Sequence, residues 1–210
     1  MAQAITVRER TIQVATLGGS ETFEILAGDN FLVIGVSYTG AGTPDVDSIL
    51  VDGEAATHDV TTKISSSVNV EMWHIHAPHT GAAIVISPGG TGATNMAMCV
   101  WKCNLANVAS TVRDTGLADG TPNDDITVTV DSDPLDHVFY IGRRDGGAPT
   151  WKSVTTSTGE VRDTVGADEA GSSPTATGTF GVTGSDANVV AVGMSVKRGR
   201  AGSGRAMAIG

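Results

Sequence analysis

The sequence predicts an all-β protein: an antiparallel β-sandwich, jelly-roll-like, with extended N- and C-terminal arms. Three observations support this prediction. The chain of 210 residues contains 27 glycines, and aromatic residues make up only 4% of it. Glycine and the abundant β-branched residues weaken helix interiors and suit short strands. Short apolar runs also recur along the whole chain, with Gly, Asp and Pro turns between them.

The first half of the chain holds six of these runs. Within one of them, Phe31 to Val36 is apolar on both faces, which predicts a central strand rather than a half-exposed one. The stretch "NLANVASTVRDTG", residues 104–116, is the one region where we predict a short helix. The six candidate strands lie within residues 4–19, 28–44, 47–56, 67–81, 81–90 and 95–104.

Five further runs follow in the second half. In "ITVTVD" the apolar Ile126, Val128 and Val130 alternate with threonines, as expected for a strand with one buried face. Residues 138–141 are apolar on both faces and predict a second central strand. The five candidates lie within residues 124–134, 136–147, 150–159, 175–186 and 188–199.

The two central strands resemble each other. When Gly35 is aligned with Gly142, "DNFLVIG" lies over "DHVFYIG", and in each an acidic turn residue leads into a buried strand that ends in glycine. Two interpretations are open. The chain consists of two similar hairpin-built halves packed face to face, or the strands resemble each other by chance.

We expect one domain with an appendage at each end. Residues 1–18 form an N-terminal arm or an edge strand, residues 19–198 form the β-sandwich, and residues 199–210 form a Gly/Arg-rich tail. The tail "GRAGSGRAMAIG" has too few apolar residues to bury itself alone. It is therefore either disordered in isolation or laid along a neighbouring subunit.

Charge and cysteine content limit the function classes. The formal net charge of −10 argues against a general nucleic-acid-binding surface. The N-terminus lacks the apolar core of a secretory signal, and no stretch reaches the roughly 18 apolar residues of a membrane helix. Cys99 and Cys103 would lie about 13 Å apart on one strand, too far for a mutual disulfide. We expect two buried free thiols, in keeping with synthesis in a reducing compartment.

The order of the strands is similar to that of an all-β domain common in bacteriophage virion proteins and in uncharacterised bacterial surface or repeat proteins. The resemblance is carried by "GDNFLVIGVSYTGAGTPDVDSILVDGEAA", "VEMWHIHAPHTGAAIVIS", "DHVFYIGRRDGGAPTW" and "NVVAVGMSVKRG", and it covers residues 20 to 198. These motifs are structural, so the resemblance implies a fold and no catalytic residues. Where relatives have Tyr and Leu after the tryptophan, this chain has His74 and His76 around Ile75.

The histidines raise the question of a metal site. His74 and His76 share one face of a strand, about 6 to 7 Å apart, and His79 or His137 could supply a third ligand. The spacing is similar to the metal motif of cupins, but the glutamate that follows there has no counterpart in "APHTGAAIVIS". We favour imidazoles packed on a neighbouring strand or at a subunit contact.

Acidic turns offer a second candidate metal site. Asp131, Asp133 and Asp136 could converge on a calcium ion, although the Gly and distal Glu of an EF-hand loop are missing. Asx turns explain most such residues. No nucleophile or phosphate-binding motif is present, so we expect neither an enzyme nor a required cofactor. Arg143 and Arg144 are expected at an exposed hairpin tip.

Two functions remain. The first is a non-enzymatic structural component of a phage-like virion, a capsid decoration or tail-associated protein made in the host cytoplasm. It would pack against copies of itself and a major capsid or tail protein, with neither nucleic acid nor membrane as partner. Its arm and tail carry the basic assembly residues Arg8, Arg10, Lys197, Arg198, Arg200 and Arg205. The alternative is a carbohydrate- or cell-surface-binding module, Ca-dependent or not, which requires exposed aromatic side chains.

Overall fold

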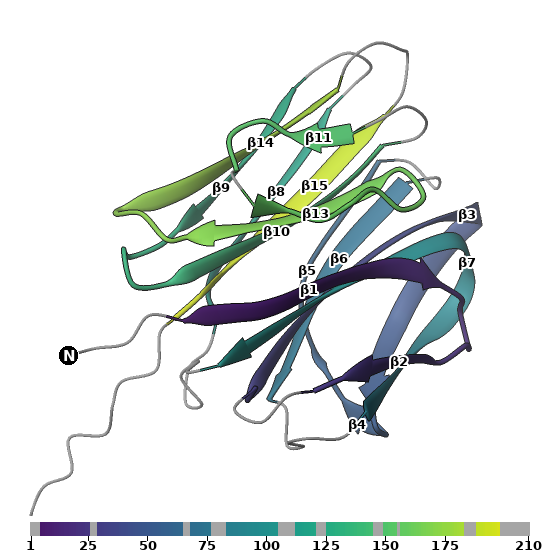
Figure 1. The fold of residues 1–210 in the computed structure, drawn as a ribbon. Helices are drawn as coiled ribbons and strands as arrows, with labels where there is room; N and C mark the ends of the chain where they lie inside the picture. The colour runs from purple at the N-terminus through teal and green to yellow at the C-terminus, as the bar shows by residue number, and fades with distance from the viewer. Residues whose placement is uncertain are drawn as a thin grey trace, which may run out of the picture.

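Every regular element in the described part of the chain is a β-strand (Figure 1). The structure is a computed structural model that describes residues 5–25, 29–64, 68–76, 83–104, 112–120, 125–144, 149–154, 156–182 and 188–197. All strand pairs within its sheets are antiparallel, and the sheets pack face to face. The predicted antiparallel β-sandwich is therefore confirmed.

The first half of the chain forms one seven-stranded sheet with the central order β1-β7-β3-β6-β5. β2 pairs with β7 and β4 pairs with β3. The segment predicted as an arm or an edge strand contains β1, which lies at one edge of this sheet. The strands are β1 (Thr6–Ala15), β2 (Glu21–Glu24), β3 (Phe31–Val51), β4 (Glu54–Ala55), β5 (Thr57–Ile64), β6 (Val68–His76) and β7 (Ala83–Asn104).

This sheet folds over on itself because β3 and β7 bend together. Their pairing shifts register between Gly40 and Asp45, and Gly92 at the bend has φ +67°. A Cβ on Gly40 would collide with the carbonyl oxygen of Gly92, so the bend requires a glycine at position 40. The ends of β3 and β7 thus form, with β2 and β4, an outer layer. Side chains of both layers make a first core that includes Leu32 and Ile86.

The second half forms two sheets, with the orders β12-β13-β10-β15-β8 and β11-β14-β9. They enclose another core, in which Tyr140, Trp151 and Phe180 are in ring contact. The strands are β8 (Val112–Gly120), β9 (Ile126–Asp131), β10 (His137–Arg144), β11 (Pro149–Trp151), β12 (Thr156–Ser157), β13 (Thr164–Ala170), β14 (Thr175–Val182) and β15 (Val189–Val196).

A further core joins the two halves. β3 and β6 each have one face that points away from the first half's own core. The side chains of this face pack against side chains from β10 and β15 of the second half. Trp101 lies at its centre, fully buried and in ring contact with Phe139, at 5.7 Å between centroids. The halves are therefore packed face to face through their inner sheets (Figure 1).

The strand orders of the two halves match throughout. The sheet order β1-β7-β3-β6-β5 corresponds to β8-β15-β10-β13-β12, and the outer layer of β2 with the ends of β7 and β3 corresponds to β9-β14-β11. Each half thus repeats one arrangement of strands, which favours the first interpretation of the sequence echo. One difference is that β4, which pairs with β3, has no counterpart among the described strands of the second half. β3 and β7 each run through both layers, and in their counterparts the passage between the layers falls on residues 145–148 and 183–187, outside the described part.

The alignment of the two glycines is nevertheless off by one residue. Gly35 lies on the face between the halves, where a Cβ would meet Ile141, while Gly142 lies on the opposite face of its strand against Phe180. Because successive strand residues point to opposite faces, Gly35 corresponds to Ile141 and not to Gly142.

The predicted helix over residues 104–116 is wrong where the structure describes it. Residues 112–116 belong to β8, which pairs with β15 from Val112↔Val196 to Gly120↔Val189. The ladder of a neighbouring strand outweighs a weak local helix preference. Residues 105–111 lie outside the described part.

Candidate functional site

Matching ion pairs stand at the entry to the central strand of each half. Arg8 of β1 lies with Nη1 3.6 Å from Oδ1 of Asp29, just before β3. Arg113 of β8, the counterpart of β1, donates from Nε to Oδ2 of Asp136, just before β10. Both aspartates are buried, at 1% and 4% exposure. Arg8, which was predicted as an assembly residue, thus pairs with an aspartate of its own chain.

The acidic turn considered as a second candidate metal site contains an arginine between its carboxylates. Arg113 donates from Nη2 to Asp133 as well as from Nε to Asp136, and the Asp133 backbone N–H donates to Asp136 Oδ2 at 3.0 Å. Asp131 donates its backbone N–H to Asp114 Oδ2 at 2.8 Å. The guanidinium supplies the positive charge between Asp133 and Asp136. Within the described ranges, no three His, Cys, Asp or Glu side chains are placed to hold a metal ion.

The histidines of β6 pack within the chain. His74 Nδ1 lies 2.8 Å from Oδ2 of Asp59 on β5. The ring centroid of Phe31 lies 5.3 Å from that of His74 and 5.4 Å from that of His76. Burial and the neighbouring His74 lower the pKa of His76. This is the packing on a neighbouring strand that we favoured over a metal site. His79 lies outside the described residues, and His137 is engaged elsewhere.

A buried carboxylate ties the first half to the second. Asp168 of β13, 1% exposed, accepts hydrogen bonds from Arg10 of β1 and lies 2.7 Å from His137 Nε2. Burial alone would raise the pKa of Asp168, but the hydrogen bonds from Arg10 and His137 outweigh it and hold the pKa below its usual range. Arg10, also predicted as an assembly residue, therefore joins the halves. No sequence pattern pointed to Asp168.

The buried thiols agree with expectation. Cys99 and Cys103 are free and buried on β7, and burial raises the pKa of both well above its ordinary value. They face the core between the halves. Neither thiol is poised as a nucleophile, because nucleophilic attack requires the thiolate.

Arg143 and Arg144 are fully buried, so their predicted exposure is wrong. Arg143 Nη1 donates to the Asn95 carbonyl at 2.7 Å and to Ser37 Oγ at 3.3 Å, both in the first half. The sequence shows two arginines before a Gly-rich turn and cannot show that the first half covers Arg143 or that Arg144 is buried.

Sequence reasoning also missed a polar cluster inside the first half. Glu71 of β6, 1% exposed, accepts hydrogen bonds from the Tyr38 hydroxyl and, at 3.1 Å, from Trp73 Nε1. His58 Nε2 lies 3.8 Å from Glu71 Oε2. Burial raises the pKa of Glu71 to about 7. The only signal was a glutamate between apolar residues, on the same face of the strand as Trp73 and Ile75.

All the aromatic residues of the chain are buried. The three Trp, two Tyr and four Phe have exposed fractions of 7% or less. Stacking on a sugar ring requires an exposed aromatic face. These residues are Phe23, Phe31, Tyr38, Trp73, Trp101, Phe139, Tyr140, Trp151 and Phe180.

The described ends of the chain leave the molecule close together. Ile5, just before β1, and Val196, the last residue of β15, belong to the same core between the halves. Figure 1 shows the start of β1 and the end of β15 meeting at one side of the molecule. Lys197 is half-buried there. The predicted assembly residues Arg198, Arg200 and Arg205 lie outside the described part.

Comparisons with family models, with curated proteins and with solved structures gave no match to this chain. Among the residues that the structure describes, no helix has the length and apolar character needed to cross a membrane.

Proposed function

We propose that this protein is a non-enzymatic structural component of a phage-like virion, either a capsid decoration or a tail-associated protein. The observation that carries the proposal is the fusion of two matching β-sandwiches through a fully buried common core. Three cores in a row, with buried ion pairs at both central strands, make a stiff block that suits a load-bearing subunit.

The position of the chain ends supports attachment through them. Both ends leave from the edge of the core between the halves, so an arm and a basic tail would reach a neighbouring subunit from one place. The tail carries Arg198, Arg200 and Arg205, whereas the whole chain has a net charge of −10. The basic tail of one copy is thus complementary in charge to the acidic body of the next. Burial of the tail between subunits would offset the conformational entropy lost when the tail becomes ordered.

The burial of the aromatic side chains favours this proposal over the alternative. A carbohydrate-binding module stacks sugars on exposed aromatic rings, and every Trp, Tyr and Phe of this chain is committed to a core. The described surface thus lacks the exposed aromatic rings that a recognition module requires.

Limited trypsin digestion tests the proposal. Isolated protein and protein in assembled particles are digested in parallel, and cleavage after Lys197, Arg198, Arg200 and Arg205 is followed by mass spectrometry. The expected result is rapid cleavage in isolation and protection in the assembly, with the body intact in both. Equal cleavage rates in the two samples would contradict attachment through the tail. If the full chain stays monomeric when it is mixed with the other proteins of the virion, the structural function itself is contradicted.

A further inference from the structure

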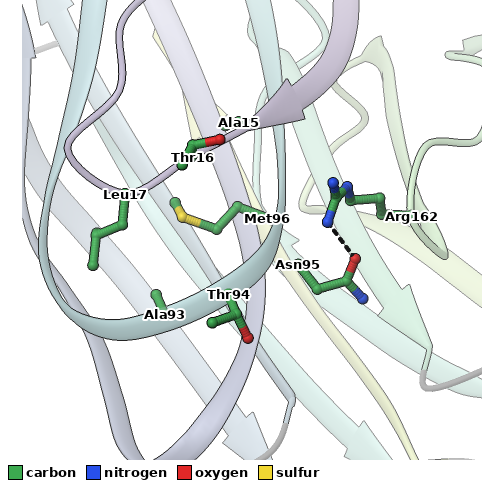
Figure 2. Close-up of a pocket in the computed structure, with 8 residues that line it drawn as sticks. All are labelled: Ala15, Thr16, Leu17, Ala93, Thr94, Asn95, Met96 and Arg162. Carbon is green, nitrogen blue, oxygen red and sulfur yellow. Dashed lines mark hydrogen bonds between the residues drawn. The ribbon is translucent and has the colours of Figure 1, made fainter.

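A cavity of about 310 Å³ opens at the far end of β1 from the chain ends (Figure 2). It lies where the turn after β1, the bend of β7 and the turn before β13 meet. Its apolar wall is formed by buried Ala15, Ala93 and Met96, with Leu17 half-buried beside them. Figure 2 shows the Met96 side chain extending toward Leu17.

The polar rim is formed by Arg162 and Asn95. Both residues are exposed, and Arg162 Nη1 donates to Asn95 Oδ1 at 2.7 Å, so a residue of the second half lies at the mouth of a cavity of the first (Figure 2). Both residues have left-handed backbone conformations, with φ +49° at Arg162 and +47° at Asn95, and so does Asp163 at +60°.

The turn that presents Arg162 is an unusual one for its sequence. Val161 and Thr164 form an antiparallel bridge around Arg162 and Asp163, which gives a two-residue hairpin with positive φ at both central positions. Glycine and asparagine are the residues that favour the first of these positions, and arginine does not. Strained residues of this kind persist where the surroundings hold them, and they gather at binding sites.

Arg162 also differs from Arg8, Arg10 and Arg113 in its partners. Arg8, Arg10 and Arg113 each hold a carboxylate. Arg162 has no carboxylate within ion-pair distance among the residues that the structure describes, although the net charge is −10. A guanidinium has five N–H donors, and the single hydrogen bond to Asn95 leaves most of them for another acceptor.

We propose that this cavity binds a small aliphatic carboxylate. The carboxylate would take the free donors of Arg162, and the aliphatic tail would lie against Met96, Ala93 and Leu17. Arginine matches a carboxylate by paired, charge-assisted hydrogen bonds, which gives the acid an advantage over a neutral analogue of the same shape. The volume lies at the lower end of ligand pockets, roughly 300 to 1,000 Å³, so a short acid fits. This site is independent of the proposed structural function.

A titration of the full chain tests the site. The methyl signal of Met96, in protein labelled at its methionine methyls, is followed by NMR while 4-methylpentanoate is added. We expect a saturable shift with a Kd on the order of 1 mM, typical of so small a ligand. With 4-methylpentanamide the binding should be at least about tenfold weaker, because the charge is gone.

Two variants locate the charge. Arg162→Gln should weaken binding of the acid at least about tenfold. Lys152→Gln removes an exposed cation from a different turn and should leave binding unchanged. No saturable shift at Met96, equal binding of acid and amide, or unchanged binding in Arg162→Gln would each overturn the proposal. The comparison of acid with amide uses unaltered protein, so it decides even if a variant folds poorly.

Discussion

Replacing Gly35 with alanine tests whether the two halves meet face to face as described. The new Cβ would lie 2.9 Å from Ile141 Cδ1 and 3.2 Å from its Cβ and Cγ2. These distances are shorter than the roughly 3.5 to 4.0 Å at which carbon atoms attract each other. Overpacking of this kind costs about 1 to 3 kcal/mol, and the stiffer backbone of alanine returns about 0.5 to 1 kcal/mol. These two terms give a net effect of about 0 to 2.5 kcal/mol, and because the nearest contact is only 2.9 Å we expect a destabilisation in the upper half of this range, about 1 to 2.5 kcal/mol.

A double-mutant cycle assigns the effect to Ile141. Ile141→Val alone should cost about 1 kcal/mol, as other buried isoleucines do. It also removes Cδ1, the atom nearest the new methyl group, so the double variant should be about 1 kcal/mol more stable than the sum of the single effects predicts. Urea unfolding followed by tryptophan fluorescence measures all four proteins. Gly159→Ala, with no heavy atom within 4 Å of the new Cβ, is the control. Additive effects, or a Gly35→Ala variant as stable as the control, would refute this packing.

Three other predictions follow from the buried charges and thiols. Asp29→Asn and Asp136→Asn should each destabilise the fold by about 1 to 3 kcal/mol, because each removes the charge of a buried carboxylate that lies beside an arginine; urea unfolding that finds either variant as stable as the unaltered protein would contradict this role for that aspartate. Burial raises the pKa of Glu71 from 4.5 to about 7, so its contribution to stability is complete below pH 4.5 and is lost as the pH rises through 7. Glu71→Gln should therefore flatten a decline on the order of 3 kcal/mol between about pH 4.5 and 7 in unfolding curves, and an unchanged pH profile would count against it. Cys99 and Cys103 should react with a thiol reagent only after unfolding, and fast labelling of native protein would show that they are accessible.

The fold class could be predicted because local signals agree along the whole chain. Alternation in "ITVTVD" predicts the burial of β9 residue by residue, and the structure has it. The predicted helix failed because the pairing of Val112 to Gly120 with β15 is a long-range effect that no local pattern contains. The glycine alignment failed by one residue because sequence similarity does not state which face of a strand a residue occupies.

The charged residues were harder to place than the apolar ones. Arg8 and Arg10 look like a basic arm in the sequence, and their carboxylate partners Asp29 and Asp168 lie far along the chain. The sequence did contain a signal for the pair of Arg8 and Asp29. In both halves, an arginine in an edge strand is followed by an aspartate before the central strand. Asp168 and Glu71 had no comparable signal, since an acidic residue in a strand does not by itself show whether its side chain is buried.

The uninterrupted course of β3 and β7 through both layers of the first half has a mechanical consequence. Two neighbouring strands pass from the inner layer to the outer layer, and their hydrogen-bonded ladder continues on both sides of the bend. A force on the outer layer is therefore transmitted along two backbones to the inner sheet, and not only through side-chain contacts between the layers. Under load the first half would keep its shape for as long as this bend stays folded.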